Sequence, residues 1–228
     1  DFRTYSLGFS PFTKMLDKWK IQCKMPVCEE YGVKMVMNTE VTPAMVAEAK
    51  PDAVIVATGS NPLVLPIPGI NDTGVIHAGD LLDGKAAVGK KVLVVGGGMV
   101  GCEVADFLGE LGHEVTVIEL RDQLGPDVIP EHRKFLMKDF EAYKVQGVTG
   151  AKVAQFFTDG VSYTLADGTE GRLEGFDNVV LAMGYRNNDT ISEEIKKIVA
   201  ETYVIGDAVK ARKALDATAE GLNAALEI

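Results

Sequence analysis

Short, continuous runs of aliphatic residues recur along the chain, and each ends in or near a glycine. Such runs are typical of strands buried on both faces of a parallel sheet, and glycine marks the turn that follows. Apolar residues at helical spacing predict helices over residues 100–111 and 130–144. Strands that alternate with helices in this way predict an α/β fold built of doubly wound sheets. The predicted strand-to-turn junctions are residues 52–59, 91–98, 114–119, 178–184 and 202–207.

The pattern changes between residues 151 and 172, where short alternating segments are interrupted by two Asp-Gly dipeptides, at residues 159–160 and 167–168. An Asp-Gly dipeptide favours the tight turn of a β-hairpin. We therefore predict a three-stranded antiparallel meander that lies over the sheet.

Two segments are expected to cross between domains. Residues 61–80 contain three prolines and several glycines, which predict an extended connection, and residues 185–189 follow the fourth predicted strand. Two crossings predict an insertion. One Rossmann-like domain, residues 89–186, is inserted into another that consists of residues 1–88 and 187–228, and a domain of that size can hold its own core.

Composition excludes several classes of protein. Acidic residues outnumber basic ones by 33 to 23, and a net charge of −10 repels a phosphate backbone, so we expect no nucleic-acid partner. The apolar runs are far shorter than the roughly 20 residues that span a bilayer, so we expect no membrane partner. Three cysteines fit a reducing compartment. We expect a cytoplasmic chain and, since it has no initiator methionine, a piece of a longer one.

The sharpest motif is Gly96-Gly97-Gly98-Met99-Val100-Gly101, which reads G-x-G-x-x-G between a predicted strand and a predicted helix. In this context Gly96 permits a tight turn, Gly98 lets the backbone approach a pyrophosphate, and Gly101 lets helix and strand pack closely. Amide groups at the start of the helix then face the phosphates. The motif predicts a site for a nicotinamide dinucleotide.

Three charged side chains bear on this site. Glu119 ends the next strand, where a carboxylate accepts hydrogen bonds from a ribose 2′-OH and favours NADH, because it repels a 2′-phosphate. Arg121 is either a solvated surface residue or a group that accepts such a phosphate, which keeps NADPH as an alternative. Glu103 is placed on the first turn of the helix. It either reaches the nicotinamide carboxamide or a cation beside a flavin, or is favoured there by the helix dipole alone. The three histidines share no spacing that suggests a metal site.

Taken together, these motifs resemble the pyridine nucleotide-disulphide oxidoreductase superfamily. The resemblance is carried by Val56-Ala-Thr-Gly-Ser60, the proline-rich connection, the Gly96–Gly101 motif with Glu103, a second Ala182-Met183-Gly184, and the terminal Ile205-Gly-Asp207. Within the superfamily, residues 38–41, 51–60 and 206–217 are most similar to the C-terminal parts of NADH:flavin oxidoreductases, the group of 2,4-dienoyl-CoA reductase, enoate reductase and trimethylamine dehydrogenase.

The resemblance implies that FAD and NAD(P)H bind to two dinucleotide domains. Asp207 is then expected to bond the FAD ribityl chain, and amides at Ala214 and Leu215 the flavin pyrimidine edge. The helix that starts near Leu215 is expected to turn Leu222 and Leu226 inward. The remaining implied contacts are Ala57, Thr58, Gly59 and Gly206 for FAD, and Ala182, Met183 and Gly184 for NAD(P).

Two features depart from the superfamily pattern. The first FAD motif is absent, since residues 1–50 contain only Gly8 and Gly32, so the FAD-type domain lacks its first βαβ unit and FAD occupancy is open. The barrel that carries FMN and an iron–sulfur cluster is also absent.

Cys23 and Cys28 have the spacing of a redox disulfide, but they lie on a predicted amphipathic helix, residues 12–31, where their thiols would point about 140° apart. A core or surface role is therefore expected for both.

These observations predict a module that passes hydride from NAD(P)H to FAD. The cofactors do the redox chemistry, so no side chain is assigned a certain catalytic role beyond orienting the rings. By resemblance, electrons go on to a flavin barrel of the same full-length chain, which reduces activated C=C bonds. One alternative is a catalytically silent module that binds NAD(H) or ADP, and another is a dithiol reductase that uses Cys23 and Cys28. A homo-oligomer remains open.

Overall fold

The computed structural model describes residues 30–71 and 74–228. They form two compact units, one of residues 64–184 and one of residues 30–63 together with residues 185–228. The segment 64–88, which the sequence assigned to the outer domain, thus belongs with the inserted one. The predicted helix over residues 12–31 lies outside the described residues except at its end, and so do Cys23 and Cys28.

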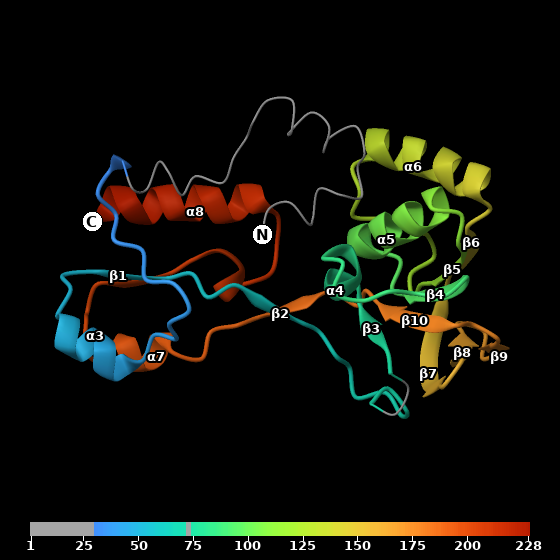
Figure 1. Cartoon of the computed structure of the whole chain (residues 1–228), viewed down its shortest axis with the longest axis horizontal. Helices are drawn as coiled ribbons and strands as arrows, with labels where there is room; N and C mark the ends of the chain where they lie inside the picture. The colour runs from blue at the N-terminus through green and yellow to red at the C-terminus, as the bar shows by residue number, and fades with distance from the viewer. Residues whose placement is uncertain (1–29, 72–73) are drawn as a thin grey trace. The chain divides into compact units, whose positions relative to one another are not determined.

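The first unit is built on a five-stranded parallel sheet (Figure 1), which confirms the predicted α/β fold. Each strand pairs with its neighbour in parallel register, and Val95, at the end of one strand, lies beside Leu181 and Ile118. In spatial order the strands are β3 (Ile76–His77), β10 (Asn178–Leu181), β4 (Lys91–Val95), β5 (Glu114–Ile118) and β6 (Gln146–Val148).

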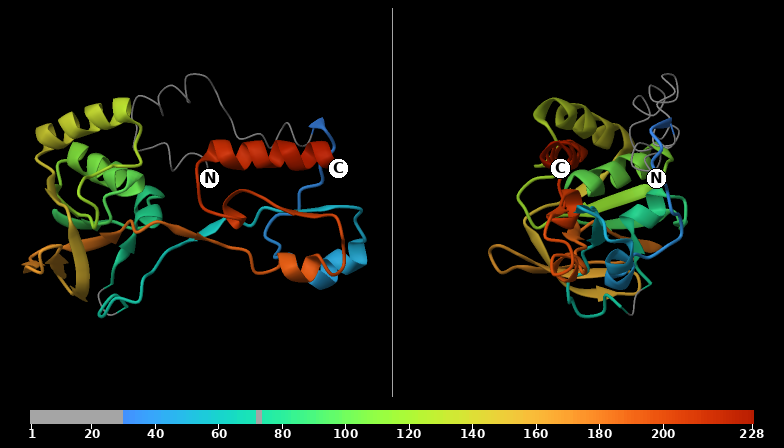
Figure 2. Two further views of the ribbon diagram at one scale, coloured as in Figure 1. Left: turned by 180° about the vertical axis from the view of Figure 1, so that it is seen from behind. Right: turned by 90° about the vertical axis from the view of Figure 1, so that its left-hand side faces the viewer.

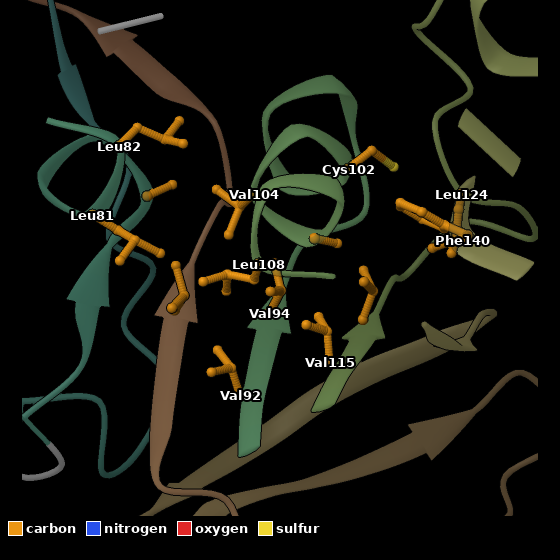
Figure 3. Packing of buried hydrophobic residues seen from close by; sticks show 14 of the residues in the cluster. Leu81, Leu82, Val92, Val94, Cys102, Val104, Leu108, Val115, Leu124 and Phe140 are labelled. Carbon is orange, nitrogen blue, oxygen red and sulfur yellow. The ribbon is translucent and has the colours of Figure 1, made fainter. Parts of the chain in front are cut away.

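Successive strand residues point to opposite faces, and both faces of this sheet are buried. On one face, Val92, Val94 and Val115 pack against the helices α4 (Ala78–Leu82), α5 (Met99–Glu110) and α6 (Pro130–Tyr143). Figure 3 shows Val104 and Leu108 of α5 directly over these valines, with Phe140 of α6 beside them. The continuous aliphatic runs of this unit are therefore strands covered on both sides, as predicted. The run at residues 52–59 was expected to be buried in the same way, but there Ile55 is 41% exposed.

An antiparallel meander covers the other face, as the Asp-Gly turns predicted. Phe156 and Val161, both almost completely buried, pack against Leu93 and Ile118 of the sheet. The meander consists of β7 (Ala151–Phe157), β8 (Gly160–Leu165) and β9 (Glu170–Leu173).

The proline-rich connection is shorter than the sequence predicted. Residues 61–80 include β3 and the start of α4, which were expected to be extended chain. Ile76 pairs with Val180 at the edge of the sheet, and Leu81 and Leu82 are buried in the helical core. These contacts explain why residues 64–88 belong to this unit.

The second unit has a small core formed by Val46, Val56, Ile195 and Val199. Strands β1 (Val54–Val56) and β12 (Thr202–Val204) pair in parallel, and the helices α3 (Pro43–Ala49) and α7 (Ser192–Ile195) supply the other buried residues. The two predicted crossing segments lie side by side, because β2 (Ser60–Pro62) pairs antiparallel with β11 (Tyr185–Asn187).

The last helix, α8 (Ala214–Glu227), follows the short helix η1 (Gly206–Ala208) and is red in Figure 2. The prediction that Leu222 and Leu226 point inward is wrong, since these side chains are 62% and 76% exposed. The inward face is instead the stripe of small residues Ala217, Gly221 and Ala224, whose centre lies about 150° from that of the leucines at 100° per residue. Ala217 lies against Gly206 and Gly221 against Ile205, and only small residues let the helix approach η1 this closely. Across residues 30–71 and 74–228, every helix is too short or too polar to cross a bilayer.

Candidate nucleotide-binding site

The glycine motif forms the turn between β4 and α5, at the carboxyl edge of the parallel sheet. Gly96 has φ +105°, and a Cβ atom there would lie 2.3 Å from the carbonyl oxygen of Ala182. A Cβ atom at Gly101 would lie only 1.8 Å from the carbonyl oxygen of Gly96. The close approach of helix and strand predicted at Gly101 is therefore present, and both positions require glycine for packing alone.

Gly98 differs from Gly96 and Gly101. It is the N-cap of α5 with an ordinary φ of −72°, and no side chain caps the helix there. A Cβ atom at this position would meet only the ends of two side chains, Arg121 at 3.2 Å and Asp127 at 3.4 and 3.5 Å. At Gly98, therefore, movable side-chain ends rather than backbone lie on the side where a diphosphate must approach.

Glu119 follows β5 and is 6% exposed. One carboxylate oxygen accepts a hydrogen bond from the amide of Gly97 at 2.5 Å. The other accepts from the amide of Arg121 at 2.9 Å and from its Nε at 3.0 Å. Glu119 therefore connects the glycine turn to the end of the neighbouring strand. Since each carboxylate oxygen has two lone pairs, the one facing Gly97 retains capacity for a further donor such as a ribose hydroxyl.

Arg121 is about half exposed and is paired with two acids. Its Nε bonds Glu119, and its Nη2 lies 3.9 Å from the carboxylate of Asp127. The guanidinium is therefore held in front of Gly98 by these two acids, which differs from the freely solvated arginine that was one of the two predicted alternatives.

Glu103 is not on the first turn of its helix, contrary to the sequence prediction. The helix begins at Met99, directly after the Gly98 cap, so the first turn holds no acid and Glu103 lies in the second. The helix dipole therefore does little to favour an acid at Glu103, since its effect falls off within one turn. Burial raises the pKa of Glu103 to about 7, and the nearby charge of Asp127 adds to the shift.

The second candidate segment of the same site, Ala182–Gly184, follows β10 at the same edge of the sheet. The amide of Ala182 donates to the carbonyl of Val95 at 2.8 Å, and its methyl group lies close to Gly101. Met183 packs in the core beneath the meander, and Gly184 has φ +94° with open space around it. The structure thus brings the predicted NAD(P) residues Gly96–Gly101, Glu119, Arg121 and Ala182–Gly184 to one sheet edge.

The residues expected to contact FAD lie in the other unit. Ala57, Thr58 and Gly59 follow β1, and Thr58 and Gly59 bond Asn188 in the adjacent crossing segment. Asp207 accepts hydrogen bonds from the hydroxyl of Ser60 at 3.0 Å and from the amide of Arg212 at 3.1 Å. Asp207 therefore stabilises the turn before α8.

Ala214 and Leu215 are the first two residues of α8. Their amides have no partner within the helix, as is usual for a first turn, and Leu215 is 79% exposed. Gly206 has φ +62°, and its amide donates to Glu220 of α8 at 2.7 Å.

Comparisons with known proteins agree with this geometry. The family model for pyridine nucleotide-disulphide oxidoreductases matches residues 32–211. The chain belongs to this family. Like its relatives, it is therefore assigned to a family of oxidoreductases that depend on flavin and nicotinamide cofactors.

Three relatives illustrate the similarity. It is 30% identical to a metal reductase of Desulforamulus reducens, over 88% of this chain and 35% of that one. It is 34% identical to an NADH oxidase of Thermoanaerobacter brockii, over 86% and 31% of the two chains. The solved structure of a 2-naphthoyl-CoA reductase complex matches with a TM-score of 0.80 and 30% identity, over 88% and 30%. The chain therefore spans about a third of the length of these relatives.

Sequence reasoning missed one residue that lies beside the glycine turn, Asp127. The amide of Gly125 donates to the carbonyl of Gly97 at 2.7 Å, which ties the loop after β5 to the glycine turn and brings Asp127 in front of Gly98. Nothing in the spacing of the loop residues signals this contact. Within residues 30–71 and 74–228, no three His, Cys, Asp or Glu side chains are grouped as a metal site requires.

The buried acid on α5 leads to a prediction for pH dependence. Because the pKa of Glu103 is raised from 4.5 to about 7, its contribution to stability is fully present below about pH 4.5 and is lost as the pH rises through 7. The Glu103→Gln variant should remove much of this loss, at most about 3 kcal/mol between pH 5 and pH 8. Urea unfolding at the two pH values measures it. Equal losses in both proteins would contradict the prediction, and a smaller residual loss is expected from Asp106, whose pKa is also raised, to about 6.

Proposed function

We propose that this chain binds NADH at the Gly96–Gly101 turn and FAD at the other unit, and that it is the electron-input part of a reductase. When both cofactors are bound to the chain, the nicotinamide would supply a hydride and the flavin would accept it. The chain's own residues position the two groups. The single observation that carries the proposal is the position of Gly98. Packing requires glycine at the other glycine positions of the turn, whereas the nearest atoms to a Cβ at Gly98 are the movable ends of two side chains.

On the nicotinamide side, the start of α5 would hold the diphosphate and Glu119 the adenosine ribose. Glu119 already accepts a hydrogen bond from the amide of Gly97, so its carboxylate is fixed beside the glycine turn. A negative charge here disfavours a 2′-phosphate, and NADH is therefore the proposed coenzyme. Glu103, half-buried in the second turn, would face the nicotinamide end and orient it.

On the flavin side, the first amides of α8 would bond the ring, and the positive end of that helix would stabilise the negative charge of a reduced flavin. Asp207 would accept a ribityl hydroxyl. Its two oxygens each carry one protein donor, which leaves lone pairs for this bond.

The final acceptor of the electrons is proposed from the names of the relatives. They share this segment, yet their names cite different acceptors: a metal, and an acyl-CoA whose ring double bonds are conjugated with a thioester carbonyl. A common segment with different acceptors supports an electron-input role here. We propose an activated C=C bond as the acceptor, reduced by a flavin-carrying part of the full-length protein that would contain FMN and an iron–sulfur cluster.

Calorimetry with the purified chain tests nucleotide binding. NADH should give saturable heat, and NADPH should bind more weakly because Glu119 repels its extra phosphate. Heat from neither coenzyme, with a folded protein by circular dichroism, would overturn the proposal.

A second experiment separates the oxidoreductase from a silent nucleotide-binding module. The chain is incubated with FAD, separated from unbound FAD, and then mixed with NADH under anaerobic conditions. A flavin absorbance that bleaches, and returns with an artificial electron acceptor, supports hydride transfer. NADH binding without retained flavin would favour the silent module.

A further inference from the structure

An ion pair of the chain itself fills the space in front of Gly98. A Cβ atom at Gly98 marks the direction from which a diphosphate approaches, and Arg121 and Asp127 lie within 3.2–3.5 Å of that point. The guanidinium of Arg121 is 3.9 Å from the Asp127 carboxylate. A coenzyme can therefore reach the turn only if this pair rearranges.

Asp127 has the charge that this position attracts. The first amides of the twelve-residue helix α5 lack a side-chain cap, and the positive end of a helix favours an anion. The negative charge of Asp127 also reaches into the site, because it helps to raise the pKa of both Glu103 and Cys102. Its carboxylate thus provides an anion where a phosphate would otherwise be.

The loop that carries Asp127 is attached to the turn. The amide of Gly125 bonds the carbonyl of Gly97 at 2.7 Å, the amide of Val128 bonds the carbonyl of Gly125 at 3.1 Å, and Leu124 packs against Gly97. The Asp127 side chain itself is about half exposed and makes no hydrogen bond to these anchors. The backbone can therefore stay in place while the carboxylate turns away.

We propose that Asp127 is an internal competitor of the coenzyme diphosphate, and that Arg121 exchanges Asp127 for the diphosphate when the coenzyme binds. Asp127 then weakens the binding of every ligand with a diphosphate at this turn. This inference rests on the proposed function, since it assumes that a dinucleotide binds there.

Neutralising Asp127 tests it. The Asp127→Asn variant should bind NADH about three- to tenfold more tightly than the wild type in calorimetry, and ADP-ribose, which has the same diphosphate, should gain equally. Asp122→Asn is the matched control, because it removes an equal charge from an exposed position of the same loop and should leave both affinities unchanged. Asp127→Ser replaces Asn if the first variant is unstable.

The role of Arg121 is tested by a double-mutant cycle. If Arg121 exchanges partners, Asp127→Asn should give little gain in an Arg121→Gln background. An equal gain in both backgrounds would overturn the exchange, and a gain confined to NADPH would show that Asp127 acts on the 2′-phosphate instead.

The outcomes separate the two proposals. Equal NADH affinity in wild type, Asp127→Asn and Asp122→Asn would overturn this inference and leave the proposed function standing. Absence of binding in all three folded proteins would overturn both.

Discussion

The Gly101→Ala variant is expected to lose about 3 kcal/mol of unfolding free energy, at the upper end of the usual cost of overpacking. The new methyl carbon would lie 1.8 Å from the carbonyl oxygen of Gly96 and 3.3 Å from the methyl of Ala182. Neither neighbour can yield easily, because one is backbone in a tight turn and the other follows a central strand. Helix α5 must therefore shift away from β4, which opens the core over Val94 and Val104. Urea unfolding followed by circular dichroism measures the loss.

Gly221→Ala is the matched control for this variant. It makes the same change inside helix α8, where the new carbon would meet only Ile205 at an ordinary 3.7 Å. Alanine is the better helix former by about 1 kcal/mol, so this variant should be as stable as the wild type or slightly more so. If Gly101→Ala and Gly221→Ala unfolded at the same urea concentration, the close packing at Gly101 would be refuted.

The Gly98→Ala variant is expected to fold normally but to bind NADH at least tenfold more weakly. Alanine tolerates the backbone at this position, where φ is −72° and ψ is −170°. Its methyl would meet only the flexible ends of Arg121 and Asp127, so the change in stability should stay below about 1 kcal/mol. The affinity falls because the methyl holds the diphosphate away from the amides at the start of α5.

Two measurements on Gly98→Ala must be combined. Urea unfolding should match the wild type, and calorimetry with NADH should show the loss of affinity. Unchanged affinity in a stable variant would contradict the assignment of the turn as the coenzyme site. Loss of stability together with affinity would instead give Gly98 the same packing role as Gly101.

The sequence predicted the parts of the fold that have a strong local pattern. The aliphatic runs at residues 91–95 and 114–118 are strands because both faces of the sheet are buried, and Asp-Gly turns fixed the meander. Strand β3 has two residues and helix α4 has five, so neither is long enough to show a period. Their place in the fold depends on contacts with β10 and α5, which lie far away in the sequence.

The errors at the candidate site have the same origin. Leucines are usually the buried residues of an amphipathic helix, but α8 is packed through Ala217, Gly221 and Ala224 because η1 lies too close for larger side chains. Glu103 was placed one turn too early because the helix start depends on the Gly98 cap. Asp127 was missed because its position is set by one loop hydrogen bond, from Gly125 to Gly97.

The glycines at the three motif positions, Gly96, Gly98 and Gly101, are under different constraints, and this affects how such a motif should be interpreted in other chains. The first and third are demanded by the meeting of two strands and a helix, whatever the chain binds. Packing of the strands and the helix does not require glycine at Gly98. A homologue that kept glycine at the positions of Gly96, Gly97 and Gly101 but carried a larger residue at the position of Gly98 would therefore still adopt this architecture. Its inability to bind a dinucleotide could be inferred from that one residue.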